Sequence, residues 1–210
     1  IISTAFLIAC DQTDSPQEES MFKFNIHTGF TSMDPAFSRN QSNIWVCDQL
    51  YNGLLKLDHK LNIVPDLAKK WHVDSTGTLY TFTLKNELYF HEHPLFMNKE
   101  DRKVRSRDFV ASFNRILDPK TASPGSWIFN GIVSQYEPFR AINDSTFQIK
   151  LNKSFPPFAG ILCMKYCSVL PKKLLDNPNY ELRKEPVGTG PFAFGSYFPD
   201  EKLIFYRNNN

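Results

Sequence analysis

The sequence carries little net charge and lacks two motifs that mark common catalytic sites. It contains 24 Lys and Arg residues against 22 Asp and Glu residues, which gives a formal net charge of +2. Because the two signs are interspersed, the sequence predicts no nucleic-acid surface. It contains neither a Gly-x-Ser-x-Gly nor a His-Glu-x-x-His motif. We therefore expect no nucleic-acid partner, no cofactor and no catalysis.

The apolar run near the N-terminus is short. Residues 4–10 end at Cys10, and a helix that spans a bilayer needs about 20 apolar residues. The run resembles the end of a bacterial lipoprotein signal, which is cleaved before a cysteine that then carries lipid. We expect residues 1–9 to be a truncated signal peptide and residues 10–20 to be a flexible tether from a lipidated Cys10 to a membrane surface. The alternative is a buried strand that begins a cytoplasmic domain.

Cysteines are few, and their number excludes a fully paired disulfide framework. If Cys10 carries lipid, then Cys47, Cys163 and Cys167 remain, which is an odd number. Cys163 and Cys167 lie four residues apart and could share one face of a helix or strand. They could bind a metal in principle, but buried small apolar side chains are the favoured interpretation.

Apolar periodicity predicts a mixture of helices and strands. The clearest helix covers residues 106–117, with Ser106 as N-cap and Asp108 in its first turn. A second helix is predicted over residues 44–54, capped by Ser42 or Asn43. Helical turns are expected over residues 65–71 and from residue 171, and a helix or strand over 158–170. Strands are expected over residues 22–27, 71–74, 79–84, 88–91, 139–142, 146–151 and 192–194.

Several segments, in this order, resemble the large solute-binding proteins of bacterial peptide importers, family 5. The resemblance runs from about residue 22 to the end of the sequence. Its pieces are Met33-Asp34-Pro35, Leu50-Tyr51-Asn52-Gly53-Leu54, residues 63–71, Tyr80-Thr81-Phe82-Thr83-Leu84, Phe90-His91, Asp108-Phe109 with Arg115, and Val187-Gly188-Thr189-Gly190-Pro191-Phe192.

The resemblance implies a fold and a domain organisation. The fold would be α/β with mixed sheets of the α+β kind, like the type II (cluster C) periplasmic binding proteins. The sequence would supply the first lobe and the extra N-terminal subdomain, with the second lobe missing. Residues 21–43 and 168–210 would belong to the core of lobe I, and residues 44–167 would form the inserted subdomain.

It also implies a function. The protein would be a monomeric receptor in the cell envelope, in the periplasm or at the extracytoplasmic face. It would capture a peptide or similar small solute and deliver it to the permease subunits of an ABC importer. Contacts with the peptide backbone are expected from Ser38, Arg39, Asn40 and Gln41. Trp127 and Tyr136 could line side-chain pockets, although packing would also explain them.

The segment Gly188-Thr189-Gly190-Pro191 resembles the turn near the hinge of this family, and Asp34 and Pro35 are expected to be structural. Two glycines permit backbone geometry closed to other residues, and proline stiffens the exit into the next strand. A phosphate-binding loop is disfavoured because no Lys-Ser/Thr follows the glycines.

The region after Phe90 departs from the family pattern, because His91-Glu92-His93-Pro94 stands where Asp-Gly usually follows the aromatic-His pair. His91 and His93 could face the same way, but no third or fourth metal ligand can be located, so a surface loop is favoured. Three other functions stay open: an exported lipid-anchored hydrolase, a structural surface lipoprotein, and a member of the same family that binds nickel or another metal chelate.

Overall fold

The computed structural model describes Lys23, Asn25 and residues 29–209. The predicted signal peptide, the lipidated Cys10 and the tether lie outside these residues, as does nearly all of the strand predicted over residues 22–27. Within the described part of the chain, no helix is long and apolar enough to cross a membrane.

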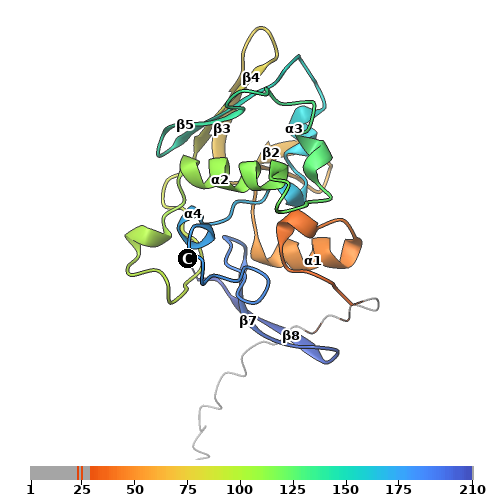
Figure 1. Cartoon of the computed structure of the whole chain (residues 1–210), viewed down its shortest axis with the longest axis vertical. Helices are drawn as coiled ribbons and strands as arrows, with labels where there is room; N and C mark the ends of the chain where they lie inside the picture. Colours follow the sequence, from red (N-terminus) through yellow and green to blue (C-terminus); the bar gives the residue numbers. More distant parts are fainter. Residues whose placement is uncertain (1–22, 24, 26–28, 210) are drawn as a thin grey trace, which may run out of the picture.

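A four-stranded antiparallel sheet forms the upper part of the molecule in Figure 1. Its strands, in spatial order, are β3 (Ala68–Val73), β4 (Leu79–Leu84), β6 (Thr146–Lys150) and β5 (Phe139–Asn143). In the central strand β4, Tyr80, Phe82 and Leu84 are buried while the residues between them are half-exposed. This alternation with a period of two places one apolar face of the sheet against the core.

Helix α2 (Ser106–Leu117) covers the buried face of this sheet and packs against β5 and β6. Phe109, Phe113 and Ile116 recur at intervals of three and four and are buried, as the sequence predicts. The predicted cap is wrong by one residue, because Ser106 is the first helical residue. The carboxylate of Asp108 accepts a hydrogen bond of 2.7 Å from the backbone N–H of Arg105 instead.

The largest hydrophobic cluster, here called the sheet core, lies between this sheet and α2. Aromatic rings dominate it: the ring centroid of Phe113 lies 5.0–6.0 Å from those of four other phenylalanines. These neighbours are Phe109, Phe129, Phe139 and Phe147. The apolar residues of the central strands and of α2 therefore meet in one continuous core.

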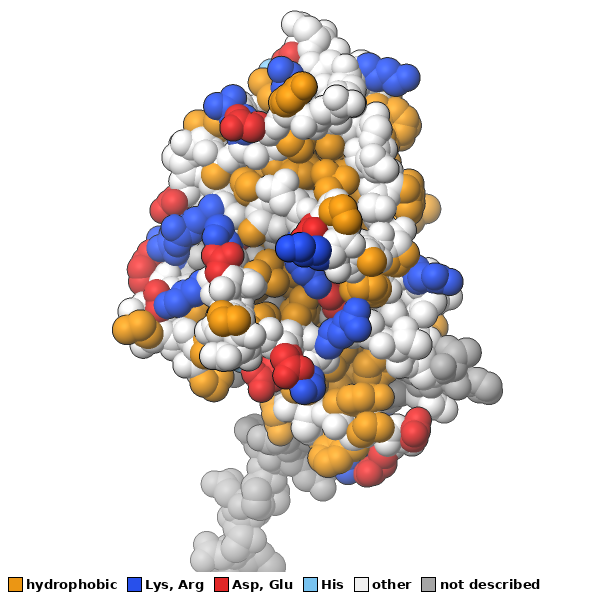
Figure 2. Space-filling model, in the orientation of Figure 1, with side chains coloured by type: hydrophobic (Ala, Val, Ile, Leu, Met, Phe, Trp, Pro, Cys, Tyr) orange, Lys and Arg blue, Asp and Glu red, His pale blue; other side chains and the backbone are white. Residues whose placement is uncertain are grey.

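A second, smaller hydrophobic cluster, here called the α1 core, lies below the sheet core in the view of Figure 1. Helix α1 (Gln41–Leu50) contributes Val46, Cys47 and Leu50 to it. The antiparallel hairpin of β7 (Phe192–Phe198) and β8 (Lys202–Arg207) packs against α1. Figure 2 shows apolar side chains exposed over this hairpin, where Tyr206 is 62% exposed. The α1 core is therefore smaller than the sheet core and lies beside a half-exposed hairpin.

The remaining elements are short. They are the hairpin of β1 (Leu55–Leu57) and β2 (Ile63–Pro65), helices α3 (Phe158–Ile161) and α4 (Lys172–Leu175), and the 3₁₀ turns η1 (Pro35–Phe37), η2 (Glu100–Arg102), η3 (Ser126–Ile128) and η4 (Lys165–Cys167). The predicted helix from residue 171 and the predicted strand from residue 192 are confirmed. The segment 158–170 contains α3 and η4.

Three predicted elements differ from the structure. Helix α1 begins at Gln41, because the side chain of Asn40 accepts the N–H of Asn43, and it ends at Leu50, where the chain becomes extended. The cap predicted at Ser42 or Asn43 is therefore wrong. Residues 68–73 form an edge strand, so the strand predicted over residues 71–74 is confirmed and the helical turns predicted over residues 65–71 are wrong. Pairing with β4 outweighs local helix propensity there. Residues 88–91 were expected to form a strand but make only a single bridge, Tyr89 to Lys103.

The domain boundaries predicted at residues 44 and 167 stay predictions.

Candidate functional site

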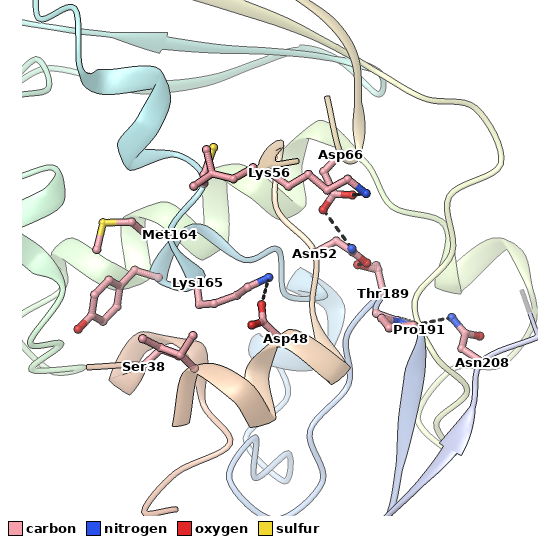
Figure 3. A pocket seen from close by; sticks show the side chains of 15 residues that line it. Ser38, Asp48, Asn52, Lys56, Asp66, Met164, Lys165, Thr189, Pro191 and Asn208 are labelled. Carbon is pink, nitrogen blue, oxygen red and sulfur yellow. Dashed lines mark hydrogen bonds and ion pairs between the residues drawn. The ribbon is translucent and has the colours of Figure 1, made fainter. Parts of the chain in front are cut away.

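An open cavity of about 810 Å³ lies between α1, the β1–β2 hairpin, η4 and the turn before β7 (Figure 3). Segments far apart in the sequence supply its walls, and most of the labelled side chains are polar. The lining residues include Ser38, Ile44, Asp48, Asn52, Lys56, Leu57, Asp66, Cys163, Met164, Lys165, Tyr166, Thr189, Gly190, Pro191 and Asn208.

One wall is residues 188–191, here called the glycine turn. A Cβ atom added to Gly188 would lie 1.9 Å from the carbonyl oxygen of Leu50, and one added to Gly190 would lie 2.4 Å from that of Gln49. Neither glycine has a positive φ, so it is this close approach, and not a left-handed backbone, that excludes other residues. Glycine is required because the backbone passes directly over the end of α1. The N–H of Gly190 also donates to the carbonyl of Leu50 at 2.9 Å.

A chain of hydrogen bonds joins the glycine turn to the β1–β2 side of the cavity. The hydroxyl of Thr189 donates to the side-chain oxygen of Asn52 at 3.1 Å. The amide nitrogen of Asn52 donates to the carboxylate of Asp66 at 3.0 Å. Asp66 is only 8% exposed, and its other oxygen lies 3.4 Å from the ammonium of Lys56. The buried carboxylate thus has both a hydrogen-bond partner and a counter-charge, as buried acids need.

A second ion pair lies elsewhere in the cavity wall. The ammonium of Lys165 in η4 lies 2.6 Å from the carboxylate of Asp48 in α1. In each ion pair one partner is shielded and the other is more exposed: the side chains of Asp66 and Lys165 are 10% and 21% exposed, against 57% for Lys56 and 41% for Asp48. The cavity therefore presents a shielded negative group and a shielded positive group.

Apolar side chains line the rest of the cavity. Ile44, Leu57 and Met164 come from α1, β1 and the residue before η4. Leu57 is 48% exposed and Met164 is 36% exposed. Apolar surface next to paired charges is the composition expected of a site for a small amphiphilic molecule.

A bidentate ion pair joins the segment before α1 to helix α2. The guanidinium of Arg115 in α2 lies 3.0 and 2.5 Å from the two carboxylate oxygens of Asp34. Asp34 is 1% exposed and also accepts the N–H of Ala36, which caps η1, and Pro35 is the first residue of that turn. The pair therefore connects the segment before α1 to the helix that covers the sheet core.

Comparison with known proteins identifies the family of the chain. A model of the bacterial extracellular solute-binding proteins, family 5, middle region, matches residues 62–210. The chain belongs to this family.

Individual family 5 relatives match over much of the chain. The dipeptide-binding protein of Escherichia coli is 29% identical over 74% of this chain and 31% of its own length. Heme-binding protein A of Haemophilus influenzae is 28% identical over 99% of this chain and 42% of its own length. The chain therefore spans roughly a third to two fifths of the length of these curated relatives.

A solved structure supports the fold. An ABC transporter-associated periplasmic binding protein from Helicobacter pylori, in complex with the peptide STSA, is 30% identical with a TM-score of 0.76. The match covers 86% of this chain and 38% of that one. The predicted fold class, a mixed α/β fold of the type II periplasmic binding proteins, is confirmed.

Of the residues predicted to contact ligand, Ser38 lines the cavity, with its hydroxyl donating to the thiol sulfur of Cys47 at 3.1 Å. The side chain of Asn40 caps α1. Burial raises the pKa of Tyr166 in the cavity wall, and the positive charge of the exposed Arg39 partly opposes this shift. Gln41 is exposed at the start of α1.

Trp127 and Tyr136 are 54% and 84% exposed and do not line the cavity. Their role as ligand contacts stays a prediction, as it does for residues 39–41. Of the predicted structural residues, Thr189, Gly190 and Pro191 line the cavity, and Gly188 lies directly behind it.

Sequence reasoning missed both ion pairs of the cavity. Asn52 and Asp66 lie within segments that carry the family resemblance, so their positions were available as a signal. Asp48 and Lys165 lie in no such segment, and their pairing depends on the packing of α1 against η4. No pattern in the sequence points to them.

The two histidines considered as a metal pair have separate partners. The ring of His91 is buried against the glycine turn, whereas that of His93 lies 2.9 Å from Glu185. Across residues 29–209, no group of three or more His, Cys, Asp or Glu side chains is arranged to hold a metal ion.

Proposed function

We propose that this protein is the substrate-binding component of an ABC importer, which captures a peptide or similar small solute and delivers it to a membrane permease. The observation that carries the proposal is the family 5 match over residues 62–210, which includes the glycine turn and one side of the open cavity. The peptide complex of the Helicobacter pylori relative supports a peptide as the ligand.

The charges of the cavity support a zwitterionic ligand. A peptide carries an ammonium and a carboxylate, and the shielded Lys165 and Asp66 have the opposite charges. Their present partners, Asp48 and Lys56, are more exposed and can turn towards solvent when a ligand takes their place. Charge-assisted hydrogen bonds of this kind are stronger than neutral ones. Ile44, Leu57 and Met164 would contact the apolar side chains of the ligand.

Ligand capture would operate by closure of two lobes. A ligand that contacts both lobes binds the closed state more tightly than the open state, so it shifts the population towards the closed state. The permease would then recognise the closed form. The cavity described here would supply the first-lobe contacts.

We further propose that Cys10 is lipidated and holds a monomeric receptor at the extracytoplasmic face of a membrane. Tethering would raise its concentration beside the permease. Labelling cells with an alkyne-tagged fatty acid should mark the protein, and Cys10→Ser should remove the label. If the label persists in Cys10→Ser, the proposed site of lipidation is wrong.

The binding proposal is tested with the product of the complete reading frame that contains this chain, carrying Cys10→Ser so that no lipid is attached. A ligand that binds only the folded state raises the unfolding temperature by mass action. We expect Ala-Ala, trialanine or tetra-alanine to raise it.

Lys165→Met should weaken peptide binding about tenfold, because it removes one charge-assisted contact. Lys184→Met is the matched control: that lysine pairs with Glu181 on the surface and lies outside the cavity. If none of the three peptides stabilises the protein, peptide capture is wrong. Hydrolysis of the peptides that a single nucleophile substitution abolished would favour the hydrolase instead.

A further inference from the structure

His91 is a buried histidine that holds the glycine turn and does not line the cavity. His91 is only 2% exposed. The backbone N–H of His91 donates to the carbonyl of Gly188 at 2.8 Å, and the ring makes two more hydrogen bonds to the same turn. Three bonds from one residue therefore fix a segment that lies 97 residues further along the chain.

These hydrogen bonds select one form of the imidazole. The N–H of Gly188 donates to Nδ1 at 3.2 Å, so Nδ1 must carry a lone pair. Nε2 lies 3.0 Å from the carbonyl oxygen of Gly190, so Nε2 must carry the proton. Protonation would put a second N–H on the ring, aimed at the N–H of Gly188. The neutral Nε2–H tautomer satisfies both contacts, and the imidazolium does not.

The turn held by His91 is a wall of the cavity. Thr189, Gly190 and Pro191 face the cavity, and Thr189 begins the hydrogen-bond chain that reaches Asp66. The carbonyl of Gly190 also accepts a bond of 3.0 Å from the side chain of Asn208, which lines the cavity. A change at His91 is therefore transmitted to the cavity through a single turn of backbone.

The charged groups around His91 favour its neutral form. Burial lowers the pKa of His91 below its usual 6.5, and the positive charge of Arg102 lowers it further, while the bond to Gly190 acts in the opposite direction. Arg102 also bonds the carbonyl of Phe90 and pairs with the exposed Glu92. The neighbouring His93 pairs with Glu185, and residues 186–191 contain no ionisable side chain.

We propose that His91 is a positioning residue for the binding cavity, and that its protonation in acid releases the glycine turn and weakens ligand binding. This inference rests on the proposed binding function of the cavity. The pKa of His91 is lowered in the folded state, so the hydrogen bond from the N–H of Gly188 to Nδ1 is intact above the unfolded-state value of about 6.5. This bond is lost as the pH falls through the folded-state pKa, because the protonated Nδ1 then opposes the N–H of Gly188.

Ligand affinity provides the first test, using the product of the complete reading frame with Cys10→Ser. Trialanine affinity is measured by calorimetry at about pH 7.5 and at a lower pH, set below the pKa that NMR titration gives for His91. The parent protein should bind about tenfold more weakly at the lower pH, as expected from one lost hydrogen bond. His91→Asn keeps an acceptor near Nδ1 but does not titrate, so its affinity should change little with pH. His72→Gln, at an exposed position in β3, is the matched control and should behave like the parent. If His91→Asn keeps the full pH dependence, the proposal is overturned.

The protonation state of the ring provides the second test, which needs no ligand. Nitrogen-15 NMR of the imidazole near pH 7.5 should show a protonated Nε2 and an unprotonated Nδ1. The protection of the Gly188 amide against hydrogen exchange, taken relative to the intrinsic rate at each pH, should fall in acid in the parent but not in His91→Asn. A protonated Nδ1 near pH 7.5 would overturn the inference. If no peptide binds at either pH, the proposed function fails, and the NMR result alone decides whether His91 holds the turn.

Discussion

The sheet core and the α1 core differ in what they bury. The sheet core packs phenylalanine rings against a regular sheet and an amphipathic helix. The α1 core is smaller and lies next to buried polar groups, among them Asp34 and His91. The cavity opens beside the α1 core. Apolar packing therefore supplies most of the stability in one region, whereas hydrogen-bonded polar groups determine the shape of the other.

This difference has a physical basis. A ring in an apolar core tolerates small shifts, because dispersion contacts are individually weak and have no strict direction. A hydrogen bond between buried groups is directional and costs free energy when it is left unmade. Substitutions in the sheet core should therefore change stability, and substitutions beside the α1 core should also change the geometry of the cavity.

Phe113→Ala should have the largest effect on stability. Phe113 is fully buried and contacts four other rings, so the substitution removes a large apolar side chain and leaves a cavity. We expect the free energy of unfolding to fall by about 4 kcal/mol, measured by urea denaturation. Tyr136→Ala, at a position that is 84% exposed, should change it by less than about 0.5 kcal/mol. Similar losses in the two variants would contradict the assignment of the sheet core.

Arg115→Met should cost about 3 kcal/mol, because it leaves the carboxylate of Asp34 buried without its bidentate partner. The double variant Asp34→Asn with Arg115→Met should recover part of this loss, since no unpaired charge is left. A double-mutant cycle from denaturation curves measures the coupling between the two residues. Purely additive losses would show that the ion pair does not connect the two regions.

Gly190→Ala should cost about 2 kcal/mol, because its Cβ would lie 2.4 Å from the backbone oxygen of Gln49. The turn must then move away from α1, so trialanine binding should weaken as well. Gly160→Ala, in α3, is the matched control, because its Cβ would meet only Ile63, at 3.9 Å. This substitution should raise the free energy of unfolding by about 0.5 kcal/mol. If Gly190→Ala is as well tolerated as the control, the close approach is not a constraint.

The smallest effect is expected from alkylation of the cysteines. Cys163 is half-buried and lines the cavity, whereas Cys47 and Cys167 are buried. Burial raises the pKa of the Cys47 thiol to about 12 and also raises those of Cys163 and Cys167. In Cys10→Ser protein treated with iodoacetamide, mass spectrometry should find Cys163 modified first and the fold retained. Earlier modification of Cys47 would show that α1 is not closed over its core.

The parts of the fold that the sequence predicted are those determined by local pattern. The periodicity of residues 106–117 indicated α2, and the alternation of residues 79–84 indicated β4, because burial on one face dictates both patterns. Helical propensity predicted residues 68–71 wrongly, since pairing with β4 decides their conformation. The glycine turn was recognised by family resemblance, but the reason for its glycines required the position of α1. The pairing of Asp48 with Lys165 required the tertiary structure entirely.

The contact between Thr189 and Asn52 joins residues that are 137 positions apart. The buried rings of the sheet core come from residues 80–166, so most of that core can form while the last part of this sequence is still being synthesised. The α1 core must wait for Leu182 and the β7–β8 hairpin that packs against it, and contacts between residues this far apart in the sequence form slowly. The cavity should therefore be the last part of the chain to fold, and until then the exposed side of α1 would be a natural binding site for a chaperone.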